Sequence, residues 1–416
     1  MPEAKYLLVG SSHAALEALR AIRRLDPDGS MAMVTRDGAL PYSPTVLPYV
    51  MSGRSRPDAV ILRDRAFFDE VGCRFVSGVA ATGLDTAARS VRLADGTQWR
   101  YGRLLVATGA APAIPPIPGL DTVAFHVLRT LDDAVGLRAR MGLARRAVVL
   151  GAGLVGLHAA ETLAEAGLSV SVIEMRGQVL PGYIDAKASA RIEAAFAGHG
   201  VKLLLGRTAT RVAAQDVGIA VTTDDGRTVE GDLLLVATGV RPVTDWLAGS
   251  GVQVERGVLV DGFLRTSAAD VWAAGDVAQG LDFASGTRQV LGIIPTAVEQ
   301  GRIAGFDMAG DAGQKPWVGG LPVNTYRFFG RPAVSVGQAA AGGDGFEVVE
   351  QDLPHLYRRI VLAGDRLVGI ASVDDPFDAG IMGELIRRRV DLAAVKDAFL
   401  ADPTAIGRRL MSEQWR

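Results

Sequence analysis

The stretch AVVLGAGLVG, residues 147–156, decides the fold of this chain. Its four leading apolar residues predict a buried strand. Gly151, Gly153 and Gly156 follow in the Gly-x-Gly-x-x-Gly spacing of a dinucleotide-binding turn. The first glycine permits a tight turn, the second lets the backbone approach a pyrophosphate, and the third lets helix and strand pack closely. We therefore predict a helix at 157–166 whose N-terminus faces the pyrophosphate.

An acidic residue after the next strand completes this pattern. A strand is predicted at 169–173, and Glu174 follows it. An acid at this place accepts hydrogen bonds from the adenosine ribose hydroxyls and repels a 2′-phosphate, which favours NAD over NADP. Arg176 stands close by and keeps NADP open as an alternative.

A looser copy of the pattern stands at the N-terminus. Residues 6–9 predict a strand, GSSHAA at 10–15 the turn, and 16–24 a helix. Ser12 replaces the second glycine and Ala15 replaces the third. Two such turns, each between a strand and a helix, predict two nucleotide-binding modules.

The first module also has an acid after its second predicted strand. That strand is expected at 30–34, and Asp37 is the best counterpart of Glu174, although Arg36 leaves the register open. Asp37 is therefore predicted to bind a ribose. The alternative for both modules is an ordinary strand–helix turn that uses glycine only for its geometry.

The composition limits the class of protein. The chain has 416 residues, enough for two or three domains, and 50 glycines, which suit many tight turns. A net charge of −2 argues against nucleic-acid binding. No apolar run reaches the ~20 residues of a membrane helix, and the N-terminus has no signal-peptide pattern. We expect no membrane span and a cytoplasmic location.

The single cysteine, Cys73, limits the redox chemistry. It cannot form an intramolecular disulfide or a cysteine-ligated iron–sulfur site within the chain, and no metal site is expected. It lies in VGCRFV, residues 71–76, which predicts the start of a strand. A packed, unreactive thiol is expected there.

A repeated strand ending divides the chain. Ala-Thr-Gly follows an apolar strand in 104–109 and again in 233–239, each time after a nucleotide-binding pattern. After about residue 322 the pattern changes to short strands at 358–362 and 367–372 and a helix at 379–388. The predicted class is α/β, with a small C-terminal α+β domain. The predicted segments are 1–118 and 250–322 for the first module, 119–249 for the second, and 323–416 for the C-terminal domain.

With these residues in hand, the chain resembles the pyridine nucleotide–disulfide oxidoreductase superfamily of two-dinucleotide flavoproteins over nearly its full length. The first turn, the two Ala-Thr-Gly segments and AGD at 274–276 resemble its FAD pattern, and 151–156 with Glu174 resembles its NAD pattern. TYRFFG at 325–330 and SVG at 335–337 resemble the start of its C-terminal interface domain. The resemblance implies two Rossmann-like domains of the glutathione-reductase type, bound FAD, and NAD(H) as co-substrate.

A narrower resemblance concerns the partner. GSSHAALEA from residue 10 and LPYSPTVLPYVMSGR at 40–54 resemble the FAD subunits of multi-subunit oxidoreductases such as phenylglyoxylate dehydrogenase and tungsten aldehyde oxidoreductase. In those complexes iron–sulfur subunits pass electrons to a flavin, which reduces NAD. The implied function is an FAD-dependent NADH:acceptor oxidoreductase that exchanges a hydride with NAD(H) and single electrons with an iron–sulfur partner. The alternatives are a free-standing ferredoxin or rubredoxin reductase, and a weakly active structural or redox-sensing flavoprotein.

Two departures from the family pattern concern catalysis. Disulfide reductases of the family carry a Cys-x-x-x-x-Cys pair, and single-cysteine relatives place a thiol where Thr45 stands here. A hydroxyl cannot act as a thiolate, so electrons must leave the flavin directly. Relatives commonly carry Glu where this chain has His158. His158 is a candidate for proton handling at flavin N5, and the alternative is a packing histidine.

The resemblance assigns further residues to cofactor binding. Asp276 is expected at the ribityl chain or pyrophosphate, with a plain helix N-cap as the alternative. A helix beginning near 294 is expected to point its amides at the flavin C2 carbonyl. Pro44, Thr45 and Tyr42 are expected near the isoalloxazine, although Tyr42 could equally be a core residue. The full set of cofactor residues is Gly10, Ser12, His13, Ala15, Asp37, Thr108, Gly109, Gly151, Gly153, Gly156, Glu174, Gly239, Gly275, Asp276 and Ala297.

Overall fold

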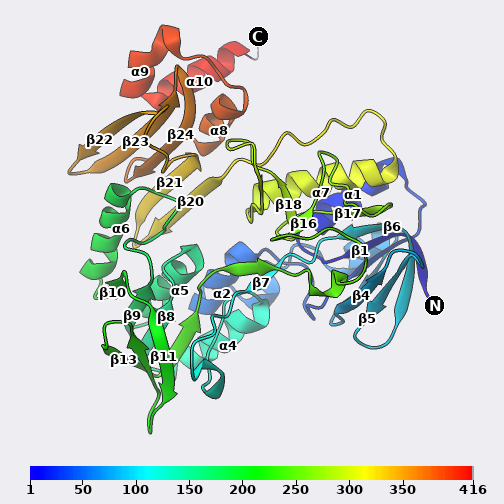
Figure 1. Ribbon diagram of the computed structural model, residues 1–416, viewed down its shortest axis with the longest axis horizontal. Coiled ribbons are helices and arrows are strands. Elements are labelled where there is room, and N and C mark those ends of the chain that lie inside the picture. Colours follow the sequence, from blue (N-terminus) through cyan, green and yellow to red (C-terminus); the bar gives the residue numbers. More distant parts are fainter. Residues whose placement is uncertain (415–416) are drawn as a thin grey trace. The chain divides into compact units, whose positions relative to one another are not determined.

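The computed structural model describes residues 1–414, which divide into two compact units (Figure 1). Unit 1 comprises Met1–Ala111, Arg129–Leu131 and Val240–Gly320. Unit 2 comprises Pro112–Leu128, Asp132–Gly239 and the residues from Leu321 onward. Both units are therefore assembled from segments that are discontinuous in sequence. The four-part domain division made from the sequence stays a prediction.

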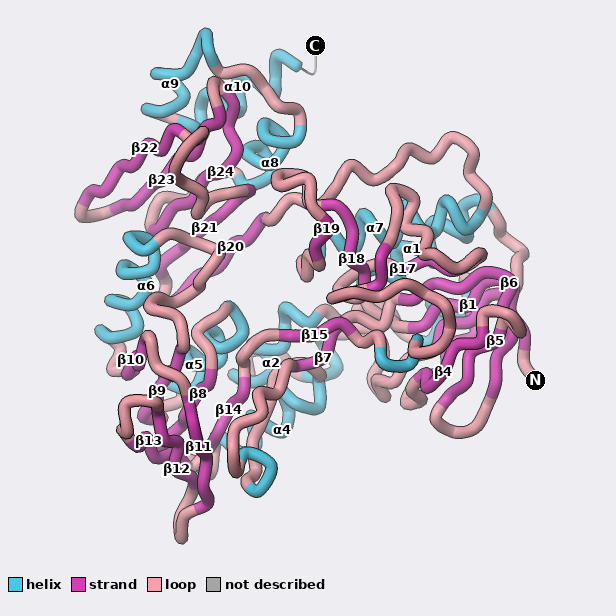
Figure 2. The backbone as a smooth tube through the Cα atoms, viewed as in Figure 1, coloured by secondary structure: helices cyan, strands magenta, loops and turns pink. Residues whose placement is uncertain are grey.

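A seven-stranded sheet forms the centre of unit 1, in the order β3-β2-β1-β6-β5-β4, with β17 also paired to β6 (Figures 1 and 2). The central pairs β1–β2, β1–β6, β2–β3 and β6–β17 are parallel, and β4 and β5 run antiparallel. Strand β17 pairs with the end of β6, and Leu104 lies opposite Val271 in this pairing. The strands are β1 (Glu3–Val9), β2 (Met31–Val34), β3 (Cys73–Val76), β4 (Ala81–Asp85), β5 (Ser90–Leu93), β6 (Gln98–Val106) and β17 (Val271–Ala273).

Two long helices of unit 1, α1 (His13–Leu25) and α7 (Ile294–Ala309), pack directly against each other (Figure 1). Small residues permit the close approach. A Cβ atom at Gly301 would overlap the carbonyl oxygen of Ala14, and one at Gly305 would crowd that of Ala18. This contact brings the middle of α7, far along the chain, beside the start of α1.

The other elements of unit 1 are short. They include the segment after β2, which the sequence resemblance assigns to the flavin. They are η1 (Pro44–Val46), α2 (Leu47–Ser52), η2 (Pro57–Val60), α3 (Arg65–Glu70), β7 (Ala110–Pro112, continuing into unit 2), β15 (Val240–Pro242), η4 (Asp245–Leu247), β16 (Val258–Leu259), β18 (Ala278–Leu281) and β19 (Arg288–Gln289).

Unit 2 contains a four-stranded parallel sheet in the order β10-β9-β8-β14, together with a three-stranded antiparallel sheet β11-β12-β13. The apolar strands β8 and β14 are fully buried except for the first residue of β8. The elements are η3 (Leu120–Thr122), α4 (Leu131–Met141), β8 (Arg146–Leu150), α5 (Leu154–Glu165), β9 (Ser169–Glu174), α6 (Ala186–Gly198), β10 (Lys202–Leu205), β11 (Ala209–Ala214), β12 (Ile219–Thr223), β13 (Thr228–Gly231) and β14 (Leu233–Val236).

The last part of unit 2 is a five-stranded antiparallel sheet in the order β20-β21-β24-β23-β22, with helices after it. Helix α6 contacts this sheet through ion pairs: Lys187 Nζ lies 2.5 Å from Glu350 Oε2, and Arg191 Nη2 lies 2.7 Å from Asp352 Oδ1. The elements are β20 (Val323–Phe328), β21 (Arg331–Gly337), β22 (Glu347–Leu353), β23 (Leu356–Ala363), β24 (Arg366–Val373), α8 (Ala379–Arg387), η5 (Ala393–Val395), α9 (Lys396–Ala401) and α10 (Pro403–Gln414).

The structure confirms the α/β class and the small C-terminal α+β domain, and it corrects several predicted limits. Helices α1 and α5 begin at His13 and Leu154, before the predicted starts at 16 and 157, because the glycine turns pass straight into helix. The strands β6 and β14 end before Ala-Thr-Gly, at Val106 and Val236. Among the described residues, no helix is long and apolar enough to cross a membrane.

Candidate functional site

In the second glycine turn, two of the three glycines have no room for a side chain, and the third has free space beside it. Gly151 has φ +103°, and a Cβ there would overlap the carbonyl oxygen of Ala237. A Cβ at Gly156 would overlap the carbonyl oxygen of Gly151. At Gly153 a Cβ would meet no described heavy atom within 4 Å. Packing therefore requires the first and third glycines, while the second leaves free space beside the backbone, as a bound pyrophosphate needs.

Glu174 anchors this turn from the end of β9. Its side chain is buried, and its two carboxylate oxygens accept hydrogen bonds from the backbone N–H groups of Ala152 and Arg176, each at 2.8 Å. The carboxylate thus stands against the glycine turn, where the sequence placed a ribose ligand.

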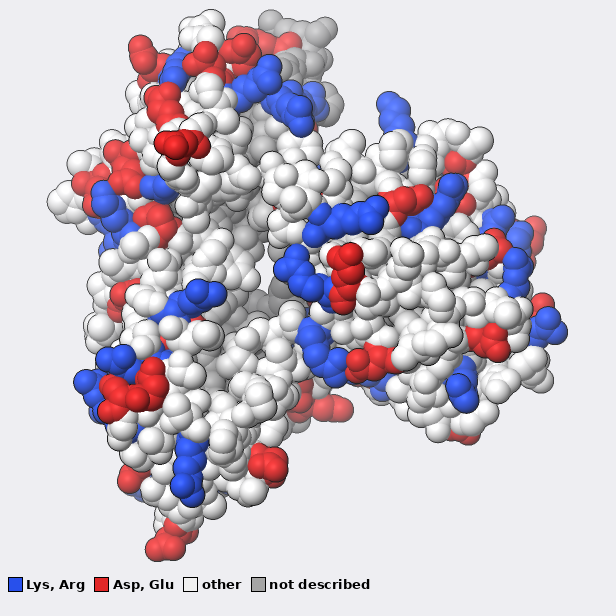
Figure 3. Space-filling view, viewed as in Figure 1, with Lys and Arg blue, Asp and Glu red and all other residues white. Residues whose placement is uncertain are grey.

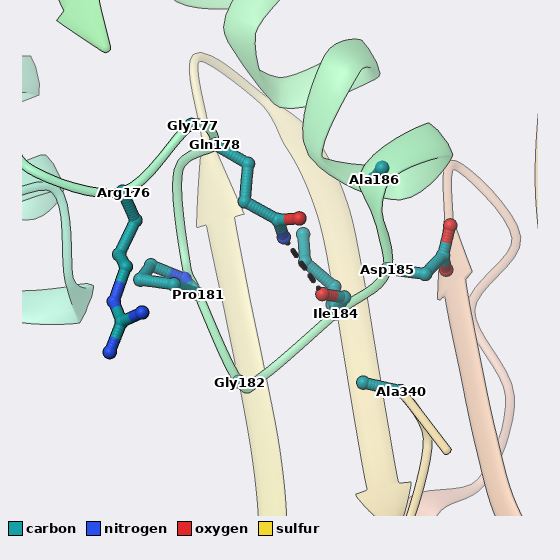
Figure 4. Close-up of a pocket in the computed structure, with 9 residues that line it drawn as sticks. All are labelled: Arg176, Gly177, Gln178, Pro181, Gly182, Ile184, Asp185, Ala186 and Ala340. Atoms are coloured by element: carbon teal, nitrogen blue, oxygen red, sulfur yellow. Dashed lines mark hydrogen bonds between the residues drawn. The ribbon is translucent and has the colours of Figure 1, made fainter. Parts of the chain in front are cut away.

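Arg176 lines a cavity of about 740 Å³ in unit 2 (Figure 4). Its side chain extends from the loop after β9, and Gln178 donates a 3.0 Å hydrogen bond to the Ile184 carbonyl across the same loop. Asp185 lines the cavity at the start of α6, where its side chain caps the helix. The Arg176 guanidinium therefore borders a cavity two residues beyond Glu174, and the NADP alternative stays open.

In the first glycine turn, the first position again has no room for a side chain, but the third position accepts one. Gly10 has φ +121°, and a Cβ there would overlap the carbonyl oxygen of Ala107. Ala15 is fully buried, so the close packing of helix and strand accommodates its methyl group. Ser12 is the N-cap residue of α1, yet within the described chain its hydroxyl makes no capping hydrogen bond.

Two helices that the sequence assigns to cofactor binding, α5 and α7, share this lack of a cap with α1. In the described part of the chain, no side chain caps the N-terminus of α1, α5 or α7, whereas aspartates cap α3, α6 and α8. The first-turn N–H groups of α1, α5 and α7 therefore remain available to an anionic or carbonyl group. In α7, the hydroxyl of Thr296 is also buried without a hydrogen-bond partner among the described residues.

The strand register corrects the expected position of the first acid. Gly10 N–H donates to the Val34 carbonyl and Gly151 N–H to the Ile173 carbonyl, both at 2.8 Å. Thr35 is therefore the counterpart of Glu174, and Asp37 lies beyond that position. The sequence could not show this because Thr35, Arg36 and Asp37 are all polar, which hides the end of β2. The ribose role of Asp37 stays a prediction.

Asp37 has partners within its own loop. Its carboxylate accepts a 2.6 Å hydrogen bond from the Tyr42 hydroxyl and a 3.0 Å bond from Ala39 N–H. The Tyr42 hydroxyl in turn accepts from Leu131 N–H at 3.0 Å. Tyr42 is buried, so the structure supports the core alternative for this residue.

The turn after β17 meets the start of α1 and α7. Gly275 has φ +81°, and a Cβ there would approach the Cβ atoms of Ala14 at 3.2 Å and Ala297 at 3.8 Å. Asp276 Oδ2 accepts a 3.0 Å hydrogen bond from Arg129 Nη2. A strand, β18, follows Asp276, so the helix N-cap alternative is wrong. Arg129 was not predicted, because no local pattern links two residues 147 positions apart.

The two Ala-Thr-Gly segments have one structural role. The hydroxyl of Thr108 donates to the Val243 carbonyl at 2.9 Å, and that of Thr238 to the Ala113 carbonyl at 2.7 Å. Gly109 and Gly239 both have positive φ, at +65° and +117°. Each segment thus turns the chain after a buried parallel strand and ties it to a neighbouring segment.

The two residues assigned to catalysis lie in different surroundings. Thr45 is exposed in η1, and its Oγ1 lies 2.9 Å from Ser43 Oγ. His158 lies on α5, with Nδ1 3.8 Å from Glu161 Oε2 and its ring centroid 4.7 Å from that of Phe328. The aromatic contact with β20 supports the packing alternative for His158. Its role in proton handling stays a prediction.

Cys73 is the packed thiol that was expected. It is buried at the start of β3, and burial raises its pKa to about 12. A thiol with this pKa is not a nucleophile near neutral pH. Among the described residues, no group of three or more His, Cys, Asp or Glu side chains could hold a metal ion.

With this geometry established, comparison with known proteins identifies the family. The family model described as pyridine nucleotide-disulphide oxidoreductase matches residues 4–301. The epsilon subunit of NADH-dependent phenylglyoxylate dehydrogenase from Aromatoleum evansii is 48% identical over 414 residues, which cover 99% of this chain and 98% of that protein.

This chain belongs to the pyridine nucleotide-disulphide oxidoreductase family.

Other similar proteins share less sequence with this chain. The nitric oxide reductase FlRd-NAD(+) reductase of Escherichia coli is 31% identical over 66% of this chain and 72% of that protein. The solved ferredoxin reductase for the CYP199A2 system of Rhodopseudomonas palustris is 28% identical, with a TM-score of 0.81 over 89% of this chain and 91% of that one. A putidaredoxin reductase in covalent complex with putidaredoxin has the same fold, with a TM-score of 0.86, 22% identity and 99% coverage of both chains.

Membership makes the chain an FAD- and NAD-binding oxidoreductase. Its one cysteine excludes the intramolecular redox disulfide that gives the family its name. The roles of the individual cofactor and catalytic residues remain predictions.

Proposed function

We propose that this chain is the NADH-dependent flavoprotein subunit of a multi-subunit dehydrogenase that oxidises phenylglyoxylate or a similar 2-oxoacid. The observation that carries the proposal is the 48% identity to the phenylglyoxylate dehydrogenase epsilon subunit over essentially the full length of both chains. Similarity that spans every segment, including the C-terminal sheet, favours the same place in the same kind of complex.

The residues of both units suit the two nucleotides. In unit 1 the uncapped N-terminus of α1 follows the Gly10 turn, and the unpartnered Thr296 hydroxyl lies in the first turn of α7, as the described residues show. In unit 2 the open space at Gly153 precedes the uncapped start of α5, and Glu174 is fixed against the turn. These residues would hold FAD and NAD(H) respectively.

When bound, the flavin would exchange a hydride with NAD(H) and single electrons with an iron–sulfur partner. The residues of the chain would position the two cofactors and set the charge around them. The dipole of α7 stabilises negative charge near its N-terminus, and Asp276, paired with Arg129, presents a fixed carboxylate beside that helix. Because Thr45 stands where relatives carry a redox thiol, electrons would leave a bound flavin directly for a protein partner.

The partner is proposed to be an iron–sulfur protein, and the two candidate docking surfaces are the segment 40–53 in unit 1 and the C-terminal sheet in unit 2. Tyr49 projects from α2 with 48% of its surface exposed, and an exposed aromatic side chain is a common anchor in interfaces. On the face shown in Figure 3, basic and acidic side chains are interleaved over the described residues, so shape and apolar contact would contribute along with charge. A specific interface should bury at least ~1,000 Å².

A second candidate, a free-standing ferredoxin reductase, is favoured by the 28% identity to the Rhodopseudomonas palustris ferredoxin reductase. Isolation from the native source under mild conditions separates the two. The subunit proposal expects other polypeptides with iron and acid-labile sulfide to accompany the chain, and phenylglyoxylate-dependent reduction of NAD⁺. An iron-free protein that reduces an added ferredoxin with NADH, and that no other subunit accompanies, would establish the second candidate instead.

A further inference from the structure

Three polar side chains of unit 1 form a continuous hydrogen-bonded chain. His13 Nε2 lies 3.0 Å from Ser43 Oγ, and Ser43 Oγ lies 2.9 Å from Thr45 Oγ1. His13 opens α1, while Ser43 and Thr45 belong to the segment after β2. Ser43, in the middle, is buried at 7% exposed, His13 is half-buried and Thr45 is exposed, so a buried hydroxyl links a half-buried ring to an open end.

We propose that His13, Ser43 and Thr45 form a proton relay at the flavin, which carries a proton between Thr45 Oγ1 and His13 Nε2. The relay rests on the proposed function, because a flavin that is oxidised one electron at a time by a protein partner must also release a proton. In relatives with a thiol at this place, sulfur chemistry involves the same position; here a hydroxyl is available only for proton transfer.

Each hop conserves atoms and moves no electrons between residues. A proton that arrives at Thr45 Oγ1 forms an O–H bond there, while the proton that Thr45 carried passes to Ser43 Oγ. The proton that Ser43 carried passes to His13 Nε2, which becomes a cation. A hydroxyl can donate and accept at once, so the same chain also runs in reverse.

The surroundings of His13 suit an acceptor. Burial lowers the pKa of His13, which favours the neutral ring, and in the tautomer that carries its proton on Nδ1, Nε2 can accept a proton. The carboxylates that face it are Glu17 on its own helix and Asp276 after β17, and both oppose the effect of burial on that pKa. Asp276 is shared with Arg129, so its charge is partly balanced. The two carboxylates thus offset part of the cost of burial, and a cation formed on His13 readily gives its proton back.

The relay lies where a parallel sheet binds its ligand. His13 follows the carboxyl end of β1, whose neighbours in the sheet are β2 and β6. Ligands of open parallel sheets bind outside the carboxyl ends of the strands. The close approach of Gly275 to Ala14 puts the turn after β17 at this same edge. A purely structural role, in which the bonds only fix the 43–45 segment, is the competing explanation.

The first test needs no NADH. The protein has five histidines, so ¹⁵N-histidine labelling and an NMR titration, with His13→Gln to identify the signal, report this ring alone. The relay expects His13 to titrate below the ordinary value of ~6.5, and expects Ser43→Ala to change its titration midpoint or tautomer. A midpoint at or above the ordinary value, or no response to Ser43→Ala, would overturn the relay.

The second test measures the proton step. Flavoprotein reduced with NADH is mixed rapidly with ferricyanide, in H₂O and D₂O and over a range of pH. Thr45→Val should slow reoxidation about 10- to 100-fold and remove its pH dependence and solvent isotope effect, whereas Thr45→Ser should keep both signatures. Thr82→Val, an exposed strand threonine in β4, is the matched control.

The outcomes separate the relay from the proposed function. Identical pH profiles and isotope effects in Thr45→Val and wild type would overturn the relay, since a structural bond carries no such signature. A wild-type flavin that NADH fails to reduce would overturn the proposed function, and the NMR titration would still decide whether the hydrogen-bonded chain tunes His13.

Discussion

The two glycine turns of this chain show which parts of a nucleotide-binding pattern are demanded by the backbone. Gly10 and Gly151 are both forced, since both have positive φ and both would overlap a carbonyl oxygen from a neighbouring strand end. The third position differs: the first module accepts the buried methyl group of Ala15, whereas the second closes on Gly156. The departure of the first module from the glycine pattern at Ala15 therefore reflects a wider spacing between helix and strand, and it is not by itself a sign that nucleotide binding is lost.

The largest expected effect tests this difference in spacing. Gly156→Ala should lower the free energy of unfolding of unit 2 by about 3 kcal/mol, because the new methyl group meets backbone and the helix must move. The reverse change in the first module, Ala15→Gly, should cost only ~1 kcal/mol, from helix propensity. Urea denaturation followed by circular dichroism measures both. Equal costs would mean that the two turns have the same spacing after all.

The second effect concerns Glu174, which has a carboxylate where the first module has Thr35. Glu174→Ala leaves the N–H groups of Ala152 and Arg176 without their acceptor, at about 1–3 kcal/mol for the buried Ala152 N–H and less for the half-buried Arg176 N–H, and would remove the proposed ribose ligand. NADH should therefore reduce the flavin more slowly, and its advantage over NADPH should narrow. Thr35→Ala should leave the NADH to NADPH ratio as in the wild type. Stopped-flow flavin reduction with each nucleotide measures the ratio, and equal wild-type rates with both would contradict the assignment.

The third prediction concerns the role of Asp37, which lies two residues beyond Thr35, the counterpart of Glu174. Tyr42→Phe removes the 2.6 Å hydrogen bond to Asp37 and the acceptor of Leu131 N–H, so stability should fall by about 1–2 kcal/mol. If Asp37 mainly fixes this loop, Asp37→Asn should cost similar stability and change the FAD dissociation constant little. A loss of FAD affinity without a loss of apoprotein stability would establish Asp37 as a ribose ligand.

The smallest effect on electron transfer is expected at Cys73. This residue opens β3, whose counterpart in the second module, β10, opens with the exposed Lys202. Cys73→Ser should leave NADH:ferricyanide activity near wild type, and iodoacetamide should label the folded protein very slowly. Loss of most activity with flavin retained would show that the thiol takes part.

The same thiol gives a pH dependence of known sign. Burial raises its pKa from 9.0 to about 12, so the unfolded chain loses this proton first. The contribution to stability is full below pH 9 and declines as the pH rises from there towards 12. Comparing unfolding free energies of wild type and Cys73→Ser over this range isolates the slope, and parallel curves would contradict the raised pKa.

The sequence predicted what depends on local pattern. The apolar runs before Gly151 and Gly10, the acid at the end of β9 and the buried thiol in β3 all lie as expected. It failed where the structure depends on how distant segments meet. The Arg129–Asp276 pair and the link from His13 to Ser43 join residues that no spacing rule connects. It also placed Asp37 in the wrong register, because three polar residues in a row carry no mark of a strand's end.

The discontinuity of the two units has a consequence for biosynthesis. All four strands of the β10-β9-β8-β14 sheet are encoded between residues 146 and 236. The sheet of unit 1 begins at residue 3 but lacks β17 until residues 271–273 have left the ribosome, so the edge of β6 at Leu104–Val106 has no partner there in the meantime. Translation therefore begins the sheet of unit 1 before the β10-β9-β8-β14 sheet and completes it afterwards. A nascent chain released before residue 271 would hold the complete β10-β9-β8-β14 sheet and an incomplete sheet of unit 1, with the apolar edge of β6 exposed to chaperones.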